Sequence, residues 1–296
     1  MLKLENINKS FAWKQVLFDI NTIIQKGEIV WIIWPNWAWK STSMKILTGF
    51  YKTDTWDVKI DWKSIFKNND LKKQIWYLPE INPLYEDMWV DEFLYYTADL
   101  KWIKNKNEEI DKVISMTWLK DKKYKFINTL SKWYKQRVWL ASALIWDPDI
   151  LVLDEPTEWL DPNQRDEMKN LISNLGKTKT ILISSHVLSE LSWTVNRVII
   201  ISDWKIKLDD SIENIQLAHN KKMVIKIIFD WNIDSSLIKQ KFKDIEEIKI
   251  DNNSMEIITI TDIRKQLLNY MNNNFDILEF YSKKIDLSDI FFETIK

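Results

Sequence analysis

The chain has 296 residues, carries 42 basic and 43 acidic side chains, and contains no cysteine and only two histidines. This length predicts one large domain and a small one, and the balanced charge argues against a general nucleic-acid-binding surface, so we expect no nucleic-acid partner. Disulfides and thiolate metal sites are excluded, a histidine-rich site is disfavoured, and the sequence has neither a signal peptide nor an apolar run near the ~20 residues that span a bilayer.

The first 80 residues alternate strand-like runs with one helix-like run. Gly27 supplies a turn before an apolar strand, and Gly49 fits the C-cap of the helix that begins near Lys40. Alternation in residues 2–8 favours an edge strand. The predicted strands cover residues 2–8, 16–24, 28–33, 58–60 and 75–78, and the predicted helix covers 40–47.

The middle of the chain becomes helical and then returns to buried strands. Apolar residues spaced by three and four predict the helices. The predicted helices cover 90–100, 107–116 and 132–145, and the predicted strands cover 149–153 and 180–184. Strands that are apolar throughout and alternate with helices predict a mainly parallel sheet with covering helices.

The C-terminal part has a different rhythm. Strands are expected over 222–229, 245–261 (a hairpin turning at 252–254) and 277–281, and helices over 236–242, 262–272 and 287–295. The order β-α-β-β-α-β is that of a small α+β ferredoxin-like domain. No catalytic group of residues stands out there, so we expect an accessory or regulatory domain.

Tryptophan occupies positions that suit glycine. The chain has 18 Trp and 3 Gly, whereas glycine alone usually makes up about 7% of a protein. Asp61-Trp62, Asp203-Trp204 and Asp230-Trp231 each follow a strand-like run, where Asp-Gly would form a hairpin turn. Our hypothesis is that a codon meaning glycine in the source organism is represented here as tryptophan. The alternative is a genuine tryptophan-rich core.

The loop between the strand at 28–33 and the helix at 40–47 carries the first chemical motif. It reads W-P-N-W-A-W-K-S-T, from Trp34, Pro35, Asn36, Trp37, Ala38 and Trp39 to Lys40, Ser41 and Thr42. With glycine at the three tryptophans it becomes G-x-x-x-x-G-K-[ST], a phosphate-binding loop. Lys40 would contact the β- and γ-phosphates and Ser41 would hold Mg²⁺.

A pair of carboxylates supplies the second motif. Asp154 and Glu155 follow the apolar strand at 149–153, at the edge where ligands bind in open α/β sheets. Asp154 could hold Mg²⁺ through water, and Glu155 could act as the general base for an attacking water.

Three further runs resemble the ATP-binding subunit of ABC transporters. L-S-K-W-Y-K-Q-R-V at 130–138 resembles the family signature L-S-G-G-Q-x-Q-R-V, although it departs at Lys132 and Tyr134. D-E-P-T at 154–157, followed by W-L-D-P, resembles D-E-P-T-x-G-L-D-P, again with tryptophan at a glycine position. S-S-H ends at His186. The resemblance covers roughly residues 1–210.

The resemblance assigns roles to five more residues. His186 matches the switch histidine that senses the γ-phosphate, and Phe11 stands where the family stacks a ring on adenine. Glu80 replaces a glutamine that contacts Mg²⁺ and the membrane subunit. Ser131 and Trp133 would meet the γ-phosphate bound by the other subunit of a dimer.

The fold class implied is α/β: a P-loop NTPase domain of the ABC type over residues 1–215, with a helical subdomain at about 83–145. The ferredoxin-like domain would cover 216–296. The resemblance also implies an ATP-hydrolysing subunit of a transporter, most similar to the exporter branch. It would work as a homodimer or heterodimer with a separate permease, cytoplasmic and peripheral on the inner face of the cell membrane.

Two other functions stay open. One is an ABC ATPase of translation or DNA repair, although such proteins usually have two cassettes or long coiled coils. The other is a protein without catalysis, because literal indoles at residues such as Trp37 and Trp133 would fill the phosphate site and the dimer interface.

Overall fold

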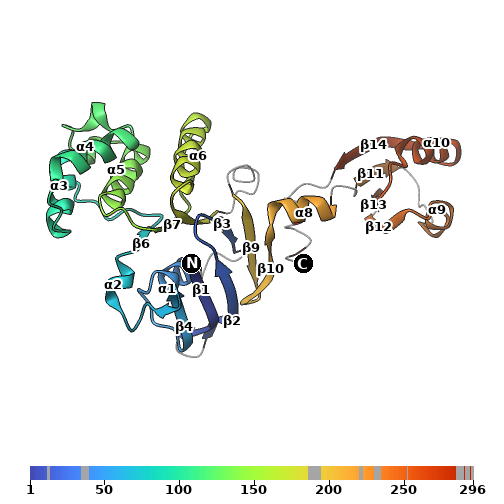
Figure 1. Cartoon of the computed structure of the whole chain (residues 1–296). Helices are drawn as coiled ribbons and strands as arrows, with labels where there is room; N and C mark the ends of the chain where they lie inside the picture. The colour runs from blue at the N-terminus through green and yellow to red at the C-terminus, as the bar shows by residue number, and fades with distance from the viewer. Residues whose placement is uncertain are drawn as a thin grey trace. The chain divides into compact units, whose positions relative to one another are not determined.

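The computed structural model describes residues 1–11, 14–34, 40–185, 195–219, 223–229, 235–251, 253–284, 290 and 294. The chain divides into two compact units, Met1–Ser211 and Ile212–Thr294, and Figure 1 labels their helices and strands. Four sequence predictions fall outside the described residues: the loop residues 35–39, His186, the turn at 230–231 and most of the helix at 287–295.

A six-stranded sheet lies at the centre of the first unit, with the order β10-β9-β3-β8-β7-β6. Its strands are β3 (Ile29–Ile33), β6 (Ile75–Leu78), β7 (Ile150–Asp154), β8 (Thr180–Ser184), β9 (Arg197–Ser202) and β10 (Lys205–Ser211). All neighbouring strands are parallel except β10, which is antiparallel to β9. Every residue of β3, β7 and β8 is buried, as expected for parallel strands covered on both faces. The predicted mainly parallel sheet is therefore confirmed.

Helices cover this sheet and form a separate group beyond its β6 end. The helices are α1 (Lys40–Leu47), α2 (Asn69–Lys72), α3 (Val90–Leu100), α4 (Lys106–Met116), α5 (Lys132–Leu144) and α6 (Pro162–Gly176). The group of α3, α4 and α5 is green in Figure 1, and its three helices pack on one another. Helix α6 was not predicted, although Asp161 and Gln164 form a capping box at its start.

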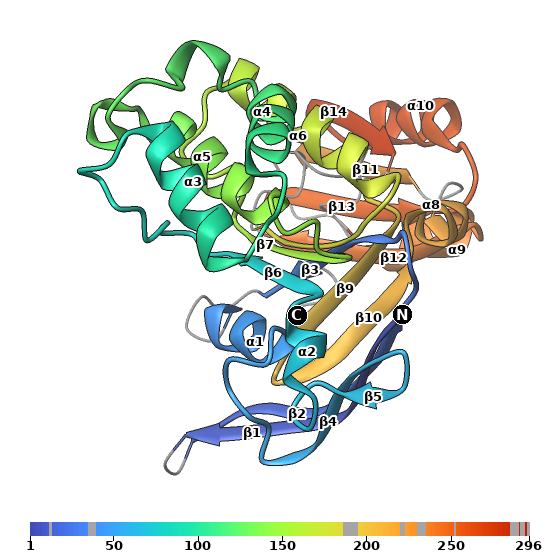
Figure 2. The ribbon, with the colours of Figure 1, turned by 60° about the vertical axis from the view of Figure 1, so that its left-hand side comes forward.

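A second, antiparallel sheet has the order β2-β1-β4-β5 and is blue in Figure 2. Its strands are β1 (Leu2–Phe11), β2 (Lys14–Ile24), β4 (Thr55–Ile60) and β5 (Lys63–Ser64). The edge position expected for residues 2–8 is wrong, because β1 pairs with both β2 and β4. Leu2, Leu4 and Ile7 enter the core of the first unit. Alternation reports which face of a strand is buried and does not report how many neighbours the strand has.

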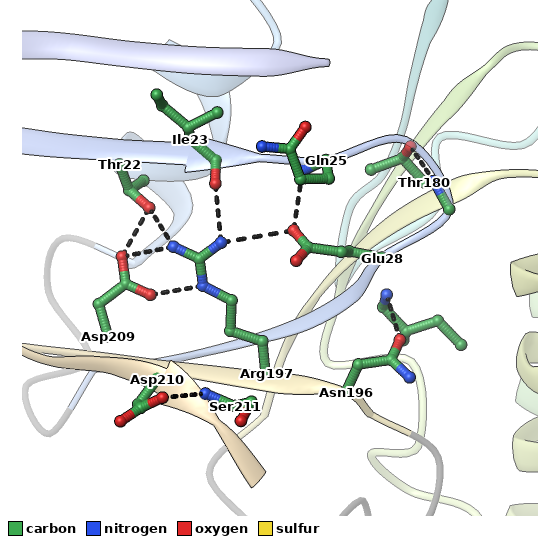
Figure 3. Close-up of polar contacts among 12 residues, drawn as sticks. Thr22, Ile23, Gln25, Glu28, Thr180, Asn196, Arg197, Asp209, Asp210 and Ser211 are labelled. Atoms are coloured by element: carbon green, nitrogen blue, oxygen red, sulfur yellow. Dashed lines mark hydrogen bonds and ion pairs between the residues drawn. The ribbon is translucent and has the colours of Figure 1, made fainter. Parts of the chain in front are cut away.

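One arginine joins the two sheets (Figure 3). The Arg197 guanidinium on β9 donates to both carboxylate oxygens of Asp209 on β10, at 2.6 and 2.8 Å. It also donates to the Ile23 carbonyl at 2.7 Å and to the Thr22 hydroxyl at 3.0 Å, both on β2. The hydrogen bond to Asp209 raises the pKa of Arg197 although burial opposes this rise. Because the planar fork is satisfied on two strands at once, it fixes β2 against β9 and β10.

The second unit contains a four-stranded antiparallel sheet in the order β12-β13-β11-β14. Its elements are α8 (Ile212–His219), β11 (Met223–Phe229), α9 (Ser235–Lys241), β12 (Ile245–Asp251), β13 (Ser254–Thr259), α10 (Arg264–Asn274) and β14 (Ile277–Lys284). The β-α-β-β-α-β order from β11 to β14 confirms the ferredoxin-like prediction. Its own core includes Ile225, Ile257 and Leu267.

Among the described residues, five tryptophans adopt left-handed backbone conformations. Their φ angles are 67° at Trp62, 57° at Trp102, 52° at Trp118, 65° at Trp159 and 68° at Trp204. Gly27 and Gly49 adopt the same region, with φ of 84° and 71°. A bulky residue with positive φ is an outlier, whereas glycine enters this region without steric cost.

The turns around these tryptophans are those that glycine normally serves. Asp61 and Asp203 also have positive φ, so the two hairpins β4–β5 and β9–β10 turn through consecutive left-handed residues. Both hairpin turns were expected from Asp-Trp read as Asp-Gly. The left-handed backbone of these turns favours glycine, whereas nothing in an indole side chain favours such a turn.

Helices α1, α3 and α4 end in one common motif. After each helix, the second residue beyond its last donates to the carbonyl three residues back, and the following residue donates to the carbonyl five residues back. This is the Schellman motif, which prefers glycine at its left-handed position. That position is Gly49 after α1 but Trp102 after α3 and Trp118 after α4.

Candidate active site

Three charged side chains meet at the carboxyl end of the parallel sheet. Lys40 opens α1, and its Nζ donates to Glu155 Oε1 at 2.8 Å and lies 3.3 Å from Asp154 Oδ1. All three side chains are buried. Burial alone would lower the pKa of Lys40, but the hydrogen bond with Glu155 and the charge of Asp154 raise it above its ordinary value. Lys40 is therefore held as an ammonium ion.

Two hydroxyl groups hold Asp154. Tyr77 on β6 donates to Oδ2 at 3.0 Å, and Ser184 at the end of β8 donates to Oδ1 at 2.6 Å. Burial, the charge of Asp154 and its hydrogen bond, and the charge of Glu80 together raise the pKa of Tyr77, so its hydroxyl stays protonated. Sequence reasoning missed Tyr77 and Ser184, although each lies at or beside the end of a predicted parallel strand.

The backbone turns sharply at the second carboxylate. Glu155 has a φ of 49°, and its N–H donates to the Ser184 hydroxyl at 3.1 Å and to the Ser184 carbonyl at 3.1 Å. A left-handed conformation costs a residue other than glycine about 1–2 kcal/mol. Backbone strain of this kind is common at active sites, where it helps to position a functional side chain. The hydrogen bonds that its N–H donates to Ser184 hold Glu155 in this conformation.

A cavity of about 350 Å³ is lined by Glu155 and by residues of α5. Glu80 and Glu155 both line it, so two predicted site residues from distant parts of the sequence meet at one hollow. The Gln136 side-chain amide donates to the Pro156 carbonyl at 2.8 Å and ties α5 to the segment after Glu155. The other lining residues are Ile81, Asn82, Leu84, Glu86, Lys132, Lys135, Gln136, Glu158, Trp159 and Leu160.

The signature-like run forms the start of α5. Ser131 is its exposed N-cap, and its hydroxyl accepts a hydrogen bond from the Tyr134 N–H at 3.4 Å. Trp133 is buried, and its ring centroid lies 4.0 Å from the Arg137 guanidinium carbon. The Ser131 hydroxyl and the N-terminus of α5 thus reach the surface together, where they can meet an anion.

The remaining predicted ligand-binding residues lie at several places. Phe11 ends β1, half-buried, with its ring edge-on to Tyr51 at 5.5 Å between centroids. Thr42 lies half-buried in α1, where Ser41 also lies, but the Ser41 side chain is not described. Trp34 is half-buried and packs against the core, and its indole N–H has no hydrogen-bond partner among the described residues. A buried N–H left unpaired costs about 1–3 kcal/mol.

The donor atoms at the sheet edge suit a nucleotide with Mg²⁺. Mg²⁺ is typically bound through one or two carboxylates together with phosphate and water oxygens. Asp154 and Glu155 supply buried carboxylates beside an ammonium that can contact phosphates. Among the described residues there is no group of three or more His, Asp or Glu side chains that could hold a metal. The two carboxylates at the sheet edge fit a metal that takes its other ligands from nucleotide and water.

Comparison with known proteins also indicates a nucleotide-binding protein. Residues 17–158 match a family model described as ABC transporter. The chain is 28% identical over 300 residues to the bacitracin transport ATP-binding protein BcrA of Bacillus licheniformis, covering 100% of this chain and 97% of that protein. It is 30% identical over 230 residues to the lantibiotic transport ATP-binding protein SrtF of Streptococcus pyogenes, covering 76% of this chain and 99% of that protein.

Solved structures share the fold of the first unit. One is a dimeric ATP-binding cassette in a post-hydrolysis state with ADP and Pi, with a TM-score of 0.64 at 23% identity, covering 72% of this chain and 99% of that one. Another is an ATP-binding subunit of an ABC transporter, with a TM-score of 0.66 at 23% identity and 74% of this chain covered. None of the helices in the described residues has the length and apolarity to cross a bilayer.

Proposed function

This chain belongs to the ABC transporter family, and on that premise we propose that it is the ATP-hydrolysing subunit of an exporter whose membrane permease is a separate polypeptide. The main support for this proposal is the position of the Lys40 ammonium beside the Asp154 and Glu155 carboxylates at the carboxyl end of the sheet. The relatives named for bacitracin and lantibiotic transport support the transport of compounds of that kind. Through its permease, the protein would lie peripherally at the inner face of the cell membrane.

Lys40 and Glu155 have linked roles in the proposed reaction. In this structure the ammonium pairs with Glu155 Oε1. Phosphates entering at the N-terminus of α1 would take over the ammonium, aided by the helix dipole. Glu155 would then be free to accept a proton from the attacking water as general base. His186 would sense the γ-phosphate, as the resemblance implies.

Asp154, Ser41 and Glu80 would hold Mg²⁺, which when bound neutralises charge on the phosphates. Phe11 would stack on the adenine ring. The part of the chain needed for this site includes the loop 34–42, whose backbone N–H groups would surround the phosphates.

We also propose a dimer, homomeric or with a related subunit, in which ATP lies between the two copies. The exposed Ser131 hydroxyl at the N-terminus of α5 supports this arrangement, because it is free to face the γ-phosphate of the neighbouring copy. Trp133, standing for glycine, would belong to the same contact. Closing and opening of the dimer would then depend on contacts made by the γ-phosphate.

The natural protein, we propose, carries glycine where this sequence has tryptophan. This proposal is supported by the left-handed tryptophans and by the indole N–H groups of Trp34 and Trp76, which find no hydrogen-bond partner in the part of the chain that the structure describes. The codons of the gene and the intact mass of the protein from its natural source test it. Eighteen ordinary tryptophan codons would overturn it. The alternative of a protein that does not hydrolyse ATP would then be favoured.

Hydrolysis measured on the full chain with its natural residues tests the enzymatic function. We expect ATPase activity that falls about 10²- to 10⁴-fold in Glu155→Gln, the usual contribution of a general base. Activity that survives this change would contradict the proposed role of Glu155. Stimulation by a reconstituted permease separates the transporter from an ABC ATPase of translation or DNA repair, which would show none.

A further inference from the structure

The Tyr77 hydroxyl contacts Asp154 but has no role in the reaction proposed above. The hydroxyl is 3.0 Å from Oδ2 of Asp154, and the two residues come from neighbouring parallel strands, β6 and β7. Asp154 itself is 1% exposed. A hydrogen bond to a buried carboxylate is charge-assisted and stronger than one between neutral groups.

The contact completes a clamp on the carboxylate. Tyr77 holds Oδ2, while the Ser184 hydroxyl holds Oδ1 at 2.6 Å. Lys40 Nζ also lies 3.3 Å from Oδ1, and with at least one donor on each oxygen the carboxylate plane cannot rotate without breaking a hydrogen bond. The Asp154 carboxylate is thereby held in a fixed orientation. Partners of this kind around a metal ligand raise metal affinity about 10- to 100-fold.

Tyr77 also lies close to the other acidic residue expected to contact the metal. Glu80 follows Tyr77 by three residues, just beyond the end of β6 at Leu78, and its negative charge acts on the Tyr77 hydroxyl. Glu80 lines the same cavity as Glu155. The tyrosine hydroxyl therefore stands among the acidic groups of the site without carrying charge itself, and it can donate to one of them.

We propose that Tyr77 is a positioning residue for the nucleotide-bound Mg²⁺: its hydroxyl orients the Asp154 carboxylate toward the metal and does not itself contact metal or nucleotide. The proposal rests on the proposed function, since it requires that this site binds nucleotide with Mg²⁺. It predicts that the hydroxyl matters for the metal and not for the nucleotide alone.

The test compares Tyr77→Phe with Tyr95→Phe in the full chain with its natural residues. Tyr77→Phe removes the hydroxyl and keeps the ring. Tyr95 is a matched control, because its hydroxyl donates to Asn107 at 2.6 Å in the helical group, away from the sheet edge. Binding of ADP is measured by calorimetry without Mg²⁺ and over a series of Mg²⁺ concentrations, so that the readout does not depend on catalysis.

We expect Tyr77→Phe to raise the Mg²⁺ concentration needed for half-maximal tightening of ADP binding by about tenfold, with Mg²⁺-free binding unchanged. Tyr95→Phe should change neither. An unchanged Mg²⁺ requirement in Tyr77→Phe would overturn the proposal, as would an equal loss of Mg²⁺-free binding, which indicates a structural role. If the unsubstituted protein bound no ADP at all, the proposed function itself would fail instead.

Discussion

The Nζ atom of Lys40 donates a hydrogen bond of 2.8 Å to Oε1 of Glu155, so the cation expected to bind phosphate is paired with the carboxylate expected to act as base. The two residues are 115 positions apart in the sequence. They meet because α1 follows β3 and Glu155 follows β7, and both strands end at the same edge of the sheet. In the proposed mechanism, nucleotide and Glu155 would therefore compete for one ammonium ion.

The first prediction concerns this competition. In Glu155→Gln the amide is a weaker partner for the ammonium than the carboxylate was, so we expect ADP to bind about three- to tenfold more tightly in the absence of Mg²⁺, equivalent to roughly 1 kcal/mol. Calorimetry with ADP measures this. Glu158→Gln is the control, since Glu158 lines the same cavity and is not paired with Lys40 in the proposed mechanism. Equal or weaker binding in Glu155→Gln would contradict the competition.

The second prediction concerns the left-handed tryptophan after α3. Trp102 is 89% exposed and has a φ of 57°. Trp102→Gly should therefore raise stability by about 1 kcal/mol, because it relieves a left-handed side chain and loses little burial. Urea denaturation measures the change.

The same substitution at the other end of α3 provides the comparison. Trp89 has an ordinary φ of −75° and packs edge-on against Phe126, with 5.1 Å between ring centroids. Trp89→Gly should lower stability because it removes that contact and relieves no strain. If both substitutions shifted stability in the same direction, backbone strain at Trp102 would not be the cause.

The third prediction concerns the arginine that joins the two sheets. Asp209→Asn removes the nearer of the two carboxylates that face the Arg197 guanidinium and leaves Glu28 at 3.4 Å. We expect a loss of about 2 kcal/mol of unfolding free energy, less than for a fully buried pair because both side chains are partly exposed. Denaturant unfolding measures this. Asp70→Asn breaks an exposed ion pair with Lys73 and should have no measurable effect. A similar response of the two variants would show that Arg197 does not join the sheets energetically.

The fourth prediction is a pH dependence of protein stability that comes from Glu5, on β1 of the antiparallel sheet. Hydrogen bonds from Lys3 and Lys59 lower the pKa of Glu5 from 4.5 to about 2. A lowered folded-state pKa means that the charged carboxylate stabilises the protein above pH 4.5, and that this contribution is lost as the pH falls towards 2. The difference in Tm between the unsubstituted protein and Glu5→Gln should therefore be constant near neutral pH and shrink across that window. A difference that stayed constant down to pH 2 would rule out this linkage.

The sequence by itself predicted most of the elements, although α6 was missed, and it singled out the residues of the main site. Apolar strands that end in a charged residue or lead into the predicted phosphate loop pointed to Lys40, Asp154 and Glu155, which the structure brings together, because these signals are local and do not depend on neighbouring strands. The ferredoxin-like order of the C-terminal unit was also visible, since each strand and helix there has its own period. The turns at Trp62 and Trp204 followed from the preceding aspartates and from the backbone that such turns require.

Only the tertiary structure decided which residues support that site. The hydrogen bond from Tyr77 to Asp154 spans 77 positions, and the one from Ser184 spans 30. Both hydrogen bonds exist because the strand order places β6 and β8 on either side of β7. The periodicity of a single strand does not predict the order of the strands in a sheet. The internal position of β1 escaped prediction for the same reason. Local pattern fixes what a segment is, whereas its neighbours are chosen by the packing of the whole sheet.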